Sequence, residues 1–128
     1  IANGGTLYEP RIVDRIGRDY ETAKIIEPTI KNKQVVSKKN IDIIREGLRA
    51  VIVYGSARSL SNFPIKTAGK TGTAQFSSEK DPHAWFTGFA PYDNPEIVVT
   101  VLIEQGKAGD LTATPIARKI FEWWFGKH

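Results

Sequence analysis

One ten-residue stretch, residues 66–75, carries the side chains best suited to chemistry in this sequence. Its residues are mostly small or hydroxyl-bearing, in an order typical of a β-strand. Thr67, Thr71 and Thr73 fall on one face of such a strand, because alternate positions share a side. Lys70 adds a fixed positive charge. Glycine within a strand often marks the close approach of another backbone or a ligand. The stretch therefore predicts an edge strand that binds an anionic, peptide-like ligand.

A nucleotide-binding P-loop is the main alternative, because Gly69-Lys70-Thr71 resembles the end of G-x-x-x-x-G-K-[ST]. That motif requires glycine at position 64, where this sequence has Pro64, and no helical pattern follows Thr71. The sequence therefore excludes a P-loop. Lys-Thr-Gly is a common tripeptide, so an ordinary structural strand stays open as the plainer interpretation.

Length and composition indicate one globular domain over residues 1–128, with 41% hydrophobic and 25% charged residues. The absence of cysteine excludes disulfides, thiol chemistry and cysteine-based zinc sites. His83 and His128 are too few and too far apart to indicate a metal site. The net charge of +4 is spread along the chain, which favours a solvated surface over a nucleic-acid interface. No apolar run approaches the roughly 18 residues that a membrane span needs.

The start of the chain suggests a longer protein. The sequence begins with Ile1 and contains no methionine, and residues 1–5 resemble the end of a helix that glycines cap. We expect the chain to be part of a larger polypeptide; a processed chain, which would begin in the same way, is the alternative.

Helical periodicity predicts two helices. The first is capped by Ser37 and runs to about residue 54; the second is capped by Thr114, has Pro115 at its first position and ends at Gly126. Their apolar positions at helical spacing are Ile41, Ile44, Leu48 and Val51 in the first, and Ile116, Ala117, Ile120, Phe121 and Trp124 in the second. Gly47 costs the first helix about 1 kcal/mol relative to alanine, so a close packing contact or weak selection must explain it.

Strand patterns predict a hairpin of residues 11–16 and 22–26, then strands at 66–75, 84–90 and 96–104. The last three follow one another with short connections and predict an antiparallel meander. The continuous apolar run of 96–104 favours burial on both faces, in the middle of a sheet with helices on each side. Residues 8–10 and 28–35 are predicted to be irregular, and 76–82 to be a polar loop. The fold class is therefore α+β.

In this order the elements resemble the C-terminal part of a penicillin-binding protein transpeptidase domain, of the class B, penicillin-binding protein 2-like kind. The motifs that carry the resemblance are Ile1-Ala2-Asn3-Gly4-Gly5, Lys70-Thr71-Gly72-Thr73-Ala74-Gln75, residues 84–91, Asn94-Pro95-Glu96 and the closing helix. K-T-G is one of three signatures of these enzymes, after S-x-x-K and S-D-N. The resemblance covers essentially the whole chain and implies part of a penicillin-binding/β-lactamase-like fold.

The resemblance implies a role for each residue of the strand. Lys70 would supply positive potential to the carboxylate of a stem peptide or β-lactam, and the hydroxyls of Thr71 and Thr73 would hydrogen-bond that carboxylate. The Thr73 N–H would form one arm of the oxyanion hole. Gly72 would let the ligand approach closely, adding like a strand, and Gln75 would contact substrate further along. Trp85, Phe86 and Phe89 are expected to be core or cleft wall, and His83 to have no catalytic part.

The resemblance also implies that the nucleophilic serine, its lysine and the S-x-N motif lie upstream of this chain. Ser77-Ser78-Glu79-Lys80 matches S-x-x-K by letters, but it falls in the polar loop rather than at the start of a buried helix, where lysine could take the serine proton. We therefore expect the chain alone to be inactive and to need the rest of its own polypeptide.

The resemblance implies that the full-length protein is a peptidoglycan D,D-transpeptidase, an enzyme of cell-wall synthesis. It would be anchored by an N-terminal segment and act outside the cytoplasmic membrane, without a cofactor or metal. Its partners would be the peptidoglycan stem peptide and β-lactam antibiotics, with no nucleic acid and no membrane contact by this segment. The alternative is a stand-alone, non-catalytic module that binds anionic cell-wall peptide or glycan.

Overall fold

The computed structural model describes residues 1–126, so His128 lies outside the described part of the chain. The fold is α+β. The elements, in chain order, are β1 (Leu7–Tyr8), β2 (Arg15–Ile16), β3 (Lys24–Ile25), β4 (Ile30–Asn32), α1 (Lys38–Val53), the 3-10 turn η1 (Arg58–Leu60), β5 (Ala68–Ala74), β6 (His83–Ala90), β7 (Ile97–Ile103) and α2 (Ala113–Phe125). They fall into two compact units, one of residues 3–41 with Ile1 and one of residues 42 onward with Ala2.

The first unit consists of two small antiparallel pairs. β2 pairs with β3, which confirms the predicted hairpin, although each strand is only two residues long. β1 pairs with β4, in segments for which the sequence predicts no regular structure. Residues 1–5 form a hydrogen-bonded turn rather than the predicted helix end, with the Gly4 N–H donating to the Ile1 carbonyl at 3.2 Å. Gly4 and Gly5 adopt positive φ values of 76° and 102°, so these glycines allow a tight turn instead of capping a helix.

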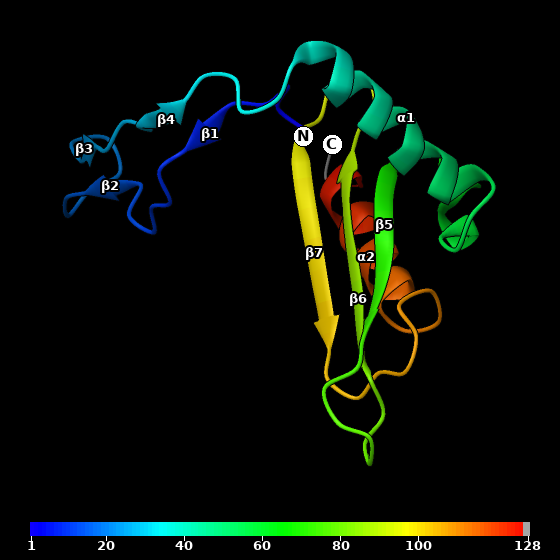
Figure 1. Ribbon diagram of the computed structural model, residues 1–128. Helices are drawn as coiled ribbons and strands as arrows, with labels where there is room; N and C mark the ends of the chain where they lie inside the picture. The colour runs from blue at the N-terminus through cyan, green and yellow to red at the C-terminus, as the bar shows by residue number, and fades with distance from the viewer. Residues whose placement is uncertain (127–128) are drawn as a thin grey trace. The chain divides into compact units, whose positions relative to one another are not determined.

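The second unit is built on the predicted meander, a three-stranded antiparallel sheet in the order β5-β6-β7 (Figure 1). The β5–β6 register places Gly69 opposite Gly88 and Thr71 opposite Phe86. The predicted edge position of β5 is confirmed.

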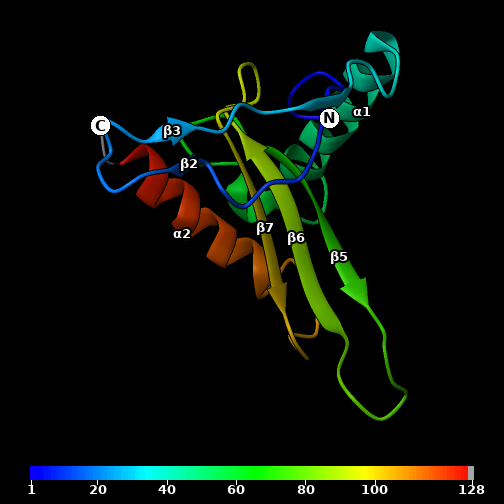
Figure 2. The same ribbon diagram turned by 90° about the vertical axis from the view of Figure 1, so that its left-hand side faces the viewer.

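Helix α2 lies against one face of this sheet, as the two views in Figures 1 and 2 show. That face carries the buried side chains Phe86 of β6 and Val99 and Val101 of β7, while α2 contributes Ala113, Ala117 and Phe121. Residues between α1 and β5 complete the core: Ala57, Leu60 and Phe63 are all buried. The opposite face is open over much of its length in the described chain, since Val98 and Leu102 are exposed there, while Phe89 at one end of that face is buried.

The prediction for residues 96–104 is therefore wrong in one respect. β7 lies at the edge of the described sheet, not in its middle, and β6 is the central strand. The unbroken apolar run misled because Val98, Thr100 and Leu102 alternate with the buried Val99 and Val101. The exposed positions of β7 are thus apolar or uncharged, so the alternation of buried and exposed residues cannot be seen in the sequence.

The helix faces are rotated relative to prediction. On α1, Ile41 is buried as predicted, but Ile44 is 39% exposed, whereas Ile52, which the prediction did not include, is fully buried. The actual inner face includes Arg45 and Arg49, which use their long side chains to reach aromatic rings and a backbone carbonyl. On α2, Ala117 and Phe121 are buried as predicted, but Ile116 and Trp124 are exposed.

Helix α2 also begins earlier than predicted, at Ala113 with Thr112 as its N-cap residue. Thr114 does not cap the helix, because its Oγ1 donates to the Gly109 carbonyl at 2.9 Å instead. None of the helices in residues 1–126 is both long and apolar enough to cross a bilayer.

Candidate active site

Strand β5 is anchored at its start from two sides. Arg49 of α1 donates from Nη1 to the Thr67 carbonyl at 2.8 Å, and the Tyr92 N–H donates to the Lys66 carbonyl at 2.7 Å. β6 pairs with β5 along its whole length, from Ala68 to Ala74. The strand is therefore held at its start and along one side, while its other side is the edge of the sheet.

Lys70 is exposed on the open face of the sheet. Its register partner is Thr87, also exposed, whereas the next pair, Thr71 and Phe86, points to the face that α2 covers. The Lys70 Nζ donates to the Thr71 carbonyl at 2.7 Å. Among the described residues no carboxylate forms an ion pair with Lys70, so its positive charge is available to an anion.

The threonine hydroxyls lie on the other face, as the alternation predicts. Thr73 is exposed, and Thr71 is half-buried with its Oγ1 hydrogen-bonded to the Ser56 Oγ at 2.5 Å. Thr67 is fully buried, and its Oγ1 has no hydrogen-bond partner among the described atoms. Only Thr71 and Thr73 can therefore offer hydroxyls to a ligand.

Ser56 is the site residue that sequence reasoning missed. It follows α1 and lies 15 positions before Thr71, within a polar segment that carries no motif. Its hydroxyl can orient that of Thr71, because each can donate to the other. No local pattern in the sequence signals this contact.

Gly72 leaves a small gap on the open face. A Cβ at this position would lie 3.2 Å from the Trp85 Cβ and 3.9 Å from its Cγ, and it would meet no other side chain beyond its neighbours in the chain. This crowding is mild compared with Gly69, where a Cβ would lie 2.7 Å from the Phe86 ring and 2.8 Å from the Thr87 carbonyl. Internal packing thus explains why position 69 is glycine. On the open face, packing gives a much weaker reason for glycine at position 72.

Gln75 makes contacts that favour a structural role. Its Nε2 donates to the carbonyls of Ser77 and, at 3.2 Å, Lys80, which ties the β5–β6 loop to the end of the strand. The Phe76 and His83 rings stack with centroids 4.1 Å apart across the base of the same loop. Contact of Gln75 with substrate stays a prediction.

Ser77, the serine of the chance S-x-x-K match, lies in the loop between β5 and β6, as the sequence predicts. Ser77 belongs to no helix, and its Oγ accepts a hydrogen bond from the Glu79 N–H at 3.1 Å. Lys80 is exposed three residues on. The helical turn that would bring a lysine beside the serine is absent at Ser77.

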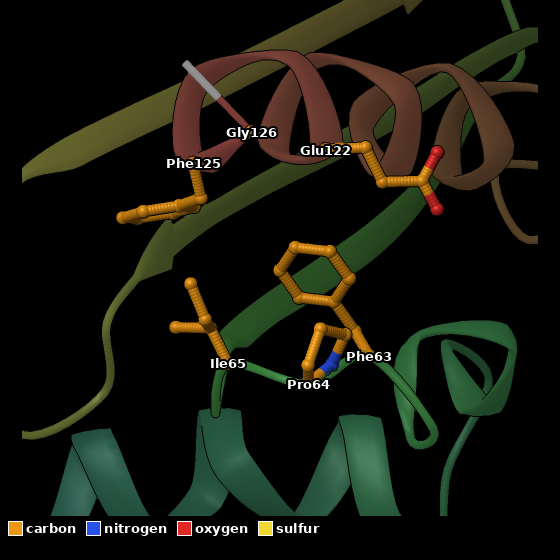
Figure 3. A pocket seen from close by; sticks show the side chains of 6 residues that line it. All are labelled: Phe63, Pro64, Ile65, Glu122, Phe125 and Gly126. Carbon is orange, nitrogen blue, oxygen red and sulfur yellow. The ribbon is translucent and has the colours of Figure 1, made fainter. Parts of the chain in front are cut away.

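A separate apolar pocket of about 380 Å³, to whose lining Lys70 does not contribute, lies beside the C-terminal end of α2 (Figure 3). The side chains of Phe63, Pro64, Ile65 and Phe125 line it. Glu122, its one charged residue, forms an ion pair with Arg118 at 2.8 Å. This lining offers no group suited to catalysis or anion binding.

The arrangement on β5 suits recognition of an anionic extended ligand. A ligand lying along the edge of a strand meets both of its faces, here the ammonium of Lys70 on one and the hydroxyls of Thr71 and Thr73 on the other. Residues 1–126 contain no cluster of three or more His, Asp or Glu side chains that could hold a metal ion.

The chain resembles known proteins over nearly its full length. The family model for the penicillin binding protein transpeptidase domain matches residues 1–122. Stage V sporulation protein D of Bacillus subtilis is 36% identical over 131 residues, which cover 92% of this chain and 20% of that protein. Peptidoglycan D,D-transpeptidase MrdA of Haemophilus influenzae is 40% identical over 75 residues, which cover 59% of this chain and 12% of that protein.

Solved structures agree with the sequence relatives. The D,D-transpeptidase domain of a peptidoglycan glycosyltransferase from Eggerthella lenta superposes with a TM-score of 0.78 at 32% identity, covering 94% of this chain and 28% of that one. Penicillin-binding protein A from M. tuberculosis, solved as a ceftriaxone acyl-enzyme complex, gives a TM-score of 0.80 at 28% identity, covering 94% of this chain and 29% of that one. The chain thus spans between 12% and 29% of the length of these relatives.

The match over residues 1–122 and the agreement of the folds show that this chain belongs to the penicillin-binding protein transpeptidase domain family, and they confirm its class B, penicillin-binding protein 2-like character.

Proposed function

We propose that this chain supplies the substrate-binding strand of a peptidoglycan D,D-transpeptidase whose nucleophilic serine lies upstream in the same polypeptide. The observation that carries the proposal is the exposed edge strand β5. It presents the uncompensated charge of Lys70 and the exposed hydroxyl of Thr73 beside Gly72, which bears no side chain. Residues 1–128 would then form part of a single transpeptidase domain.

The reaction would be an acyl transfer. The serine attacks the carbonyl of the D-Ala-D-Ala amide, D-alanine leaves with the proton that the serine gave up, and the amine of a second stem peptide takes the acyl group. Lys70 supplies positive potential to the terminal carboxylate from the open face of the strand, and Thr71 and Thr73 hydrogen-bond that carboxylate from the other face. The Thr73 N–H donates to the oxyanion of the tetrahedral intermediate, with the serine's own N–H as the second donor.

The relatives support both the substrate and the inhibitor class. MrdA of H. influenzae is a peptidoglycan D,D-transpeptidase, and the mycobacterial protein forms an acyl-enzyme with ceftriaxone. We extend both properties to this chain, with stem peptide and β-lactam as its ligands. We also place the whole protein on the outer side of the cytoplasmic membrane, held by an N-terminal anchor, where that substrate lies.

The test uses the whole polypeptide and a fluorescent penicillin. Lys70→Ala should lower the second-order acylation rate constant by about tenfold to a hundredfold, which corresponds to about 1.4–2.8 kcal/mol of lost electrostatic stabilisation. Lys66→Ala is the matched control, since Lys66 precedes the same strand, is exposed and pairs only with the exposed Asp93 at 3.7 Å. This control should change the rate constant by less than about threefold. Equal effects of the two substitutions would contradict the assignment of Lys70.

The stand-alone binding module makes a different prediction. Under that hypothesis the protein binds stem peptide reversibly, through the same strand, and no covalent adduct forms. Mass spectrometry after exposure to penicillin separates the two: an adduct on an upstream serine supports the transpeptidase. An adduct on Ser77 would contradict our placement of the nucleophile.

A further inference from the structure

The loop between β7 and α2, residues 104–112, comes close to the backbone of both β5 and β6 at Gly109. A Cβ on Gly109 would lie 2.2 Å from the Trp85 carbonyl oxygen, 2.7 Å from the Gly72 carbonyl oxygen and 3.1 Å from the Gly72 nitrogen. Separations below 3.0 Å from backbone atoms leave no room for any side chain. Gly109 therefore lies so close to the main chain of Trp85 and of Gly72, in the proposed substrate-binding strand, that only glycine fits there.

The Gly72 carbonyl belongs to the same peptide group as the Thr73 N–H. A peptide group is planar and trans, so the carbonyl oxygen and the N–H point in opposite directions within one rigid plane. Whatever fixes the Gly72 oxygen also fixes the direction of the Thr73 N–H. This N–H is the donor that the proposed function assigns to the oxyanion hole, and donors of this kind act through alignment fixed before the reaction.

We propose that Gly109 is a positioning residue of the transpeptidase site, which packs on the Gly72–Thr73 peptide and sets the direction of the Thr73 N–H. The inference rests on the proposed function, because that function supplies the role of Thr73. Gly109 itself touches no reacting atom. It acts by filling the space into which the Gly72 carbonyl would otherwise rotate.

The loop is built to hold Gly109 in place. The Gly109 carbonyl accepts two hydrogen bonds from Thr114, one from its N–H at 2.8 Å and one from its Oγ1 at 2.9 Å. Thr114 is fully buried at the start of α2. Thr112 Oγ1 lies 3.0 Å from both the Gly106 and the Ala108 carbonyls, which closes the loop on itself. The support for β5 thus runs from α2 through Gly109.

Gly106 provides an internal comparison on the same loop. A Cβ there would lie 2.8 Å from the Ile103 side chain and 2.9 Å from the Ala84 Cβ, so this position is also crowded, although less than Gly109, where the nearest backbone atom would lie at 2.2 Å. The three nearest atoms belong to side chains of β7 and β6, not to β5. Substitution at Gly106 disturbs packing of the loop without touching the Gly72–Thr73 peptide.

The experiment compares Gly109→Ala with Gly106→Ala in the whole polypeptide, measuring thermal unfolding and the kinetics of acylation by a fluorescent penicillin. The kinetics are separated into the dissociation constant of the initial complex and the rate constant of acylation. Both variants should lose thermal stability. Only Gly109→Ala should lower the acylation rate constant, by about a hundredfold, as expected for loss of one oxyanion donor. Its dissociation constant should change by less than about threefold, because the carboxylate contacts remain.

A second, less disruptive pair of variants tests the inference if Gly109→Ala does not fold. Thr114→Val removes one of the two donors to the Gly109 carbonyl, and Thr114→Ser keeps it. Thr114→Val should reduce the acylation rate constant by about threefold to tenfold, and Thr114→Ser should restore it.

Two results would overturn the inference: equal acylation rate constants for Gly109→Ala and Gly106→Ala, or a Thr114→Val protein that acylates as fast as the parent. Absence of acylation in the unmodified protein would instead refute the proposed function itself.

Discussion

The ring of Phe86 fills the space that two facing glycines leave open, and this can be tested by adding one methyl group. Gly69 and Gly88 are register partners on β5 and β6, and Phe86 is fully buried above them. In Gly88→Ala the new Cβ would lie 2.7 Å and 2.8 Å from two ring carbons of Phe86, and 2.8 Å from the Ala68 carbonyl. Two of the three closest contacts are thus with one side chain.

Overpacking of this kind costs about 1–3 kcal/mol, and the ring should account for most of it at Gly88. Phe86→Leu removes the far end of the ring and creates space at the point of the clash. We expect the double variant Gly88→Ala/Phe86→Leu to be more stable than the sum of the single changes predicts, by about 1 kcal/mol or more. At Gly69 two of the three closest contacts are backbone atoms, so Phe86→Leu should relieve Gly69→Ala much less.

The assay is urea denaturation of the parent, both single variants and the double variant, followed by circular dichroism. Gly72→Ala is the control, because its nearest neighbour is the Trp85 Cβ at 3.2 Å and the Phe86 ring is not among its close contacts. It should show no coupling to Phe86→Leu. The reasoning would be refuted if the changes in the free energy of unfolding of Gly88→Ala and Phe86→Leu sum to that of the double variant within about 0.3 kcal/mol.

Four substitutions test other parts of the second unit by the same denaturation assay. Gly47→Ala should stabilise the protein by about 1 kcal/mol, because a Cβ there meets nothing within 4 Å and alanine is the better helix former; a loss of stability would contradict this. Thr67→Val should gain about 1 kcal/mol by removing a buried hydroxyl without a partner, whereas Thr114→Val, equally buried but hydrogen-bonded, should lose stability. Arg118→Met should lose about 1–2 kcal/mol, because this side chain bonds Glu122 and two acceptors in the segment after α1; a change below about 0.3 kcal/mol would count against the link.

Most of the second unit could be predicted from the sequence. Strong local patterns place α1 and the three strands of the meander within a few residues, because their apolar periods and turn residues act at short range. The short strands β1 and β4 could not be found in the same way. Leu7 and Tyr8 pair with residues more than twenty positions away, and two-residue strands carry no measurable alternation.

The helix faces show a different reason for error. A hydrophobic pattern treats arginine as an outward-facing residue, yet Arg45 lies 5.3 Å from the Phe89 ring and 5.4 Å from the Tyr92 ring. Arg49 reaches the backbone of Thr67. Side chains with long apolar stems and a polar end occupy the inner face of α1 without leaving a signature in the apolar spacing.

Only part of the candidate site could be predicted from the sequence. Lys70, Thr71 and Thr73 could be placed on opposite faces of one strand from alternation alone, and the register confirms it. Gln75 could not be judged, because its hydrogen bonds to the loop depend on how that loop folds back. Ser56 and Gly109 lie far from the strand in sequence, and each approaches it only through the tertiary fold.

The facing glycines beneath Phe86 also determine which residues the strand shows to each side. Because side chains alternate with a period of two, sliding β5 by one residue along β6 would exchange its two faces. Lys70 would then point toward α2, and the hydroxyl of Thr71 would move to the open face. Such a slip would bring Ala68 or Lys70 opposite Gly88 in place of Gly69, with a side chain where the ring now lies. The two facing glycines thus help to keep the positive charge of Lys70 on the open face of the sheet.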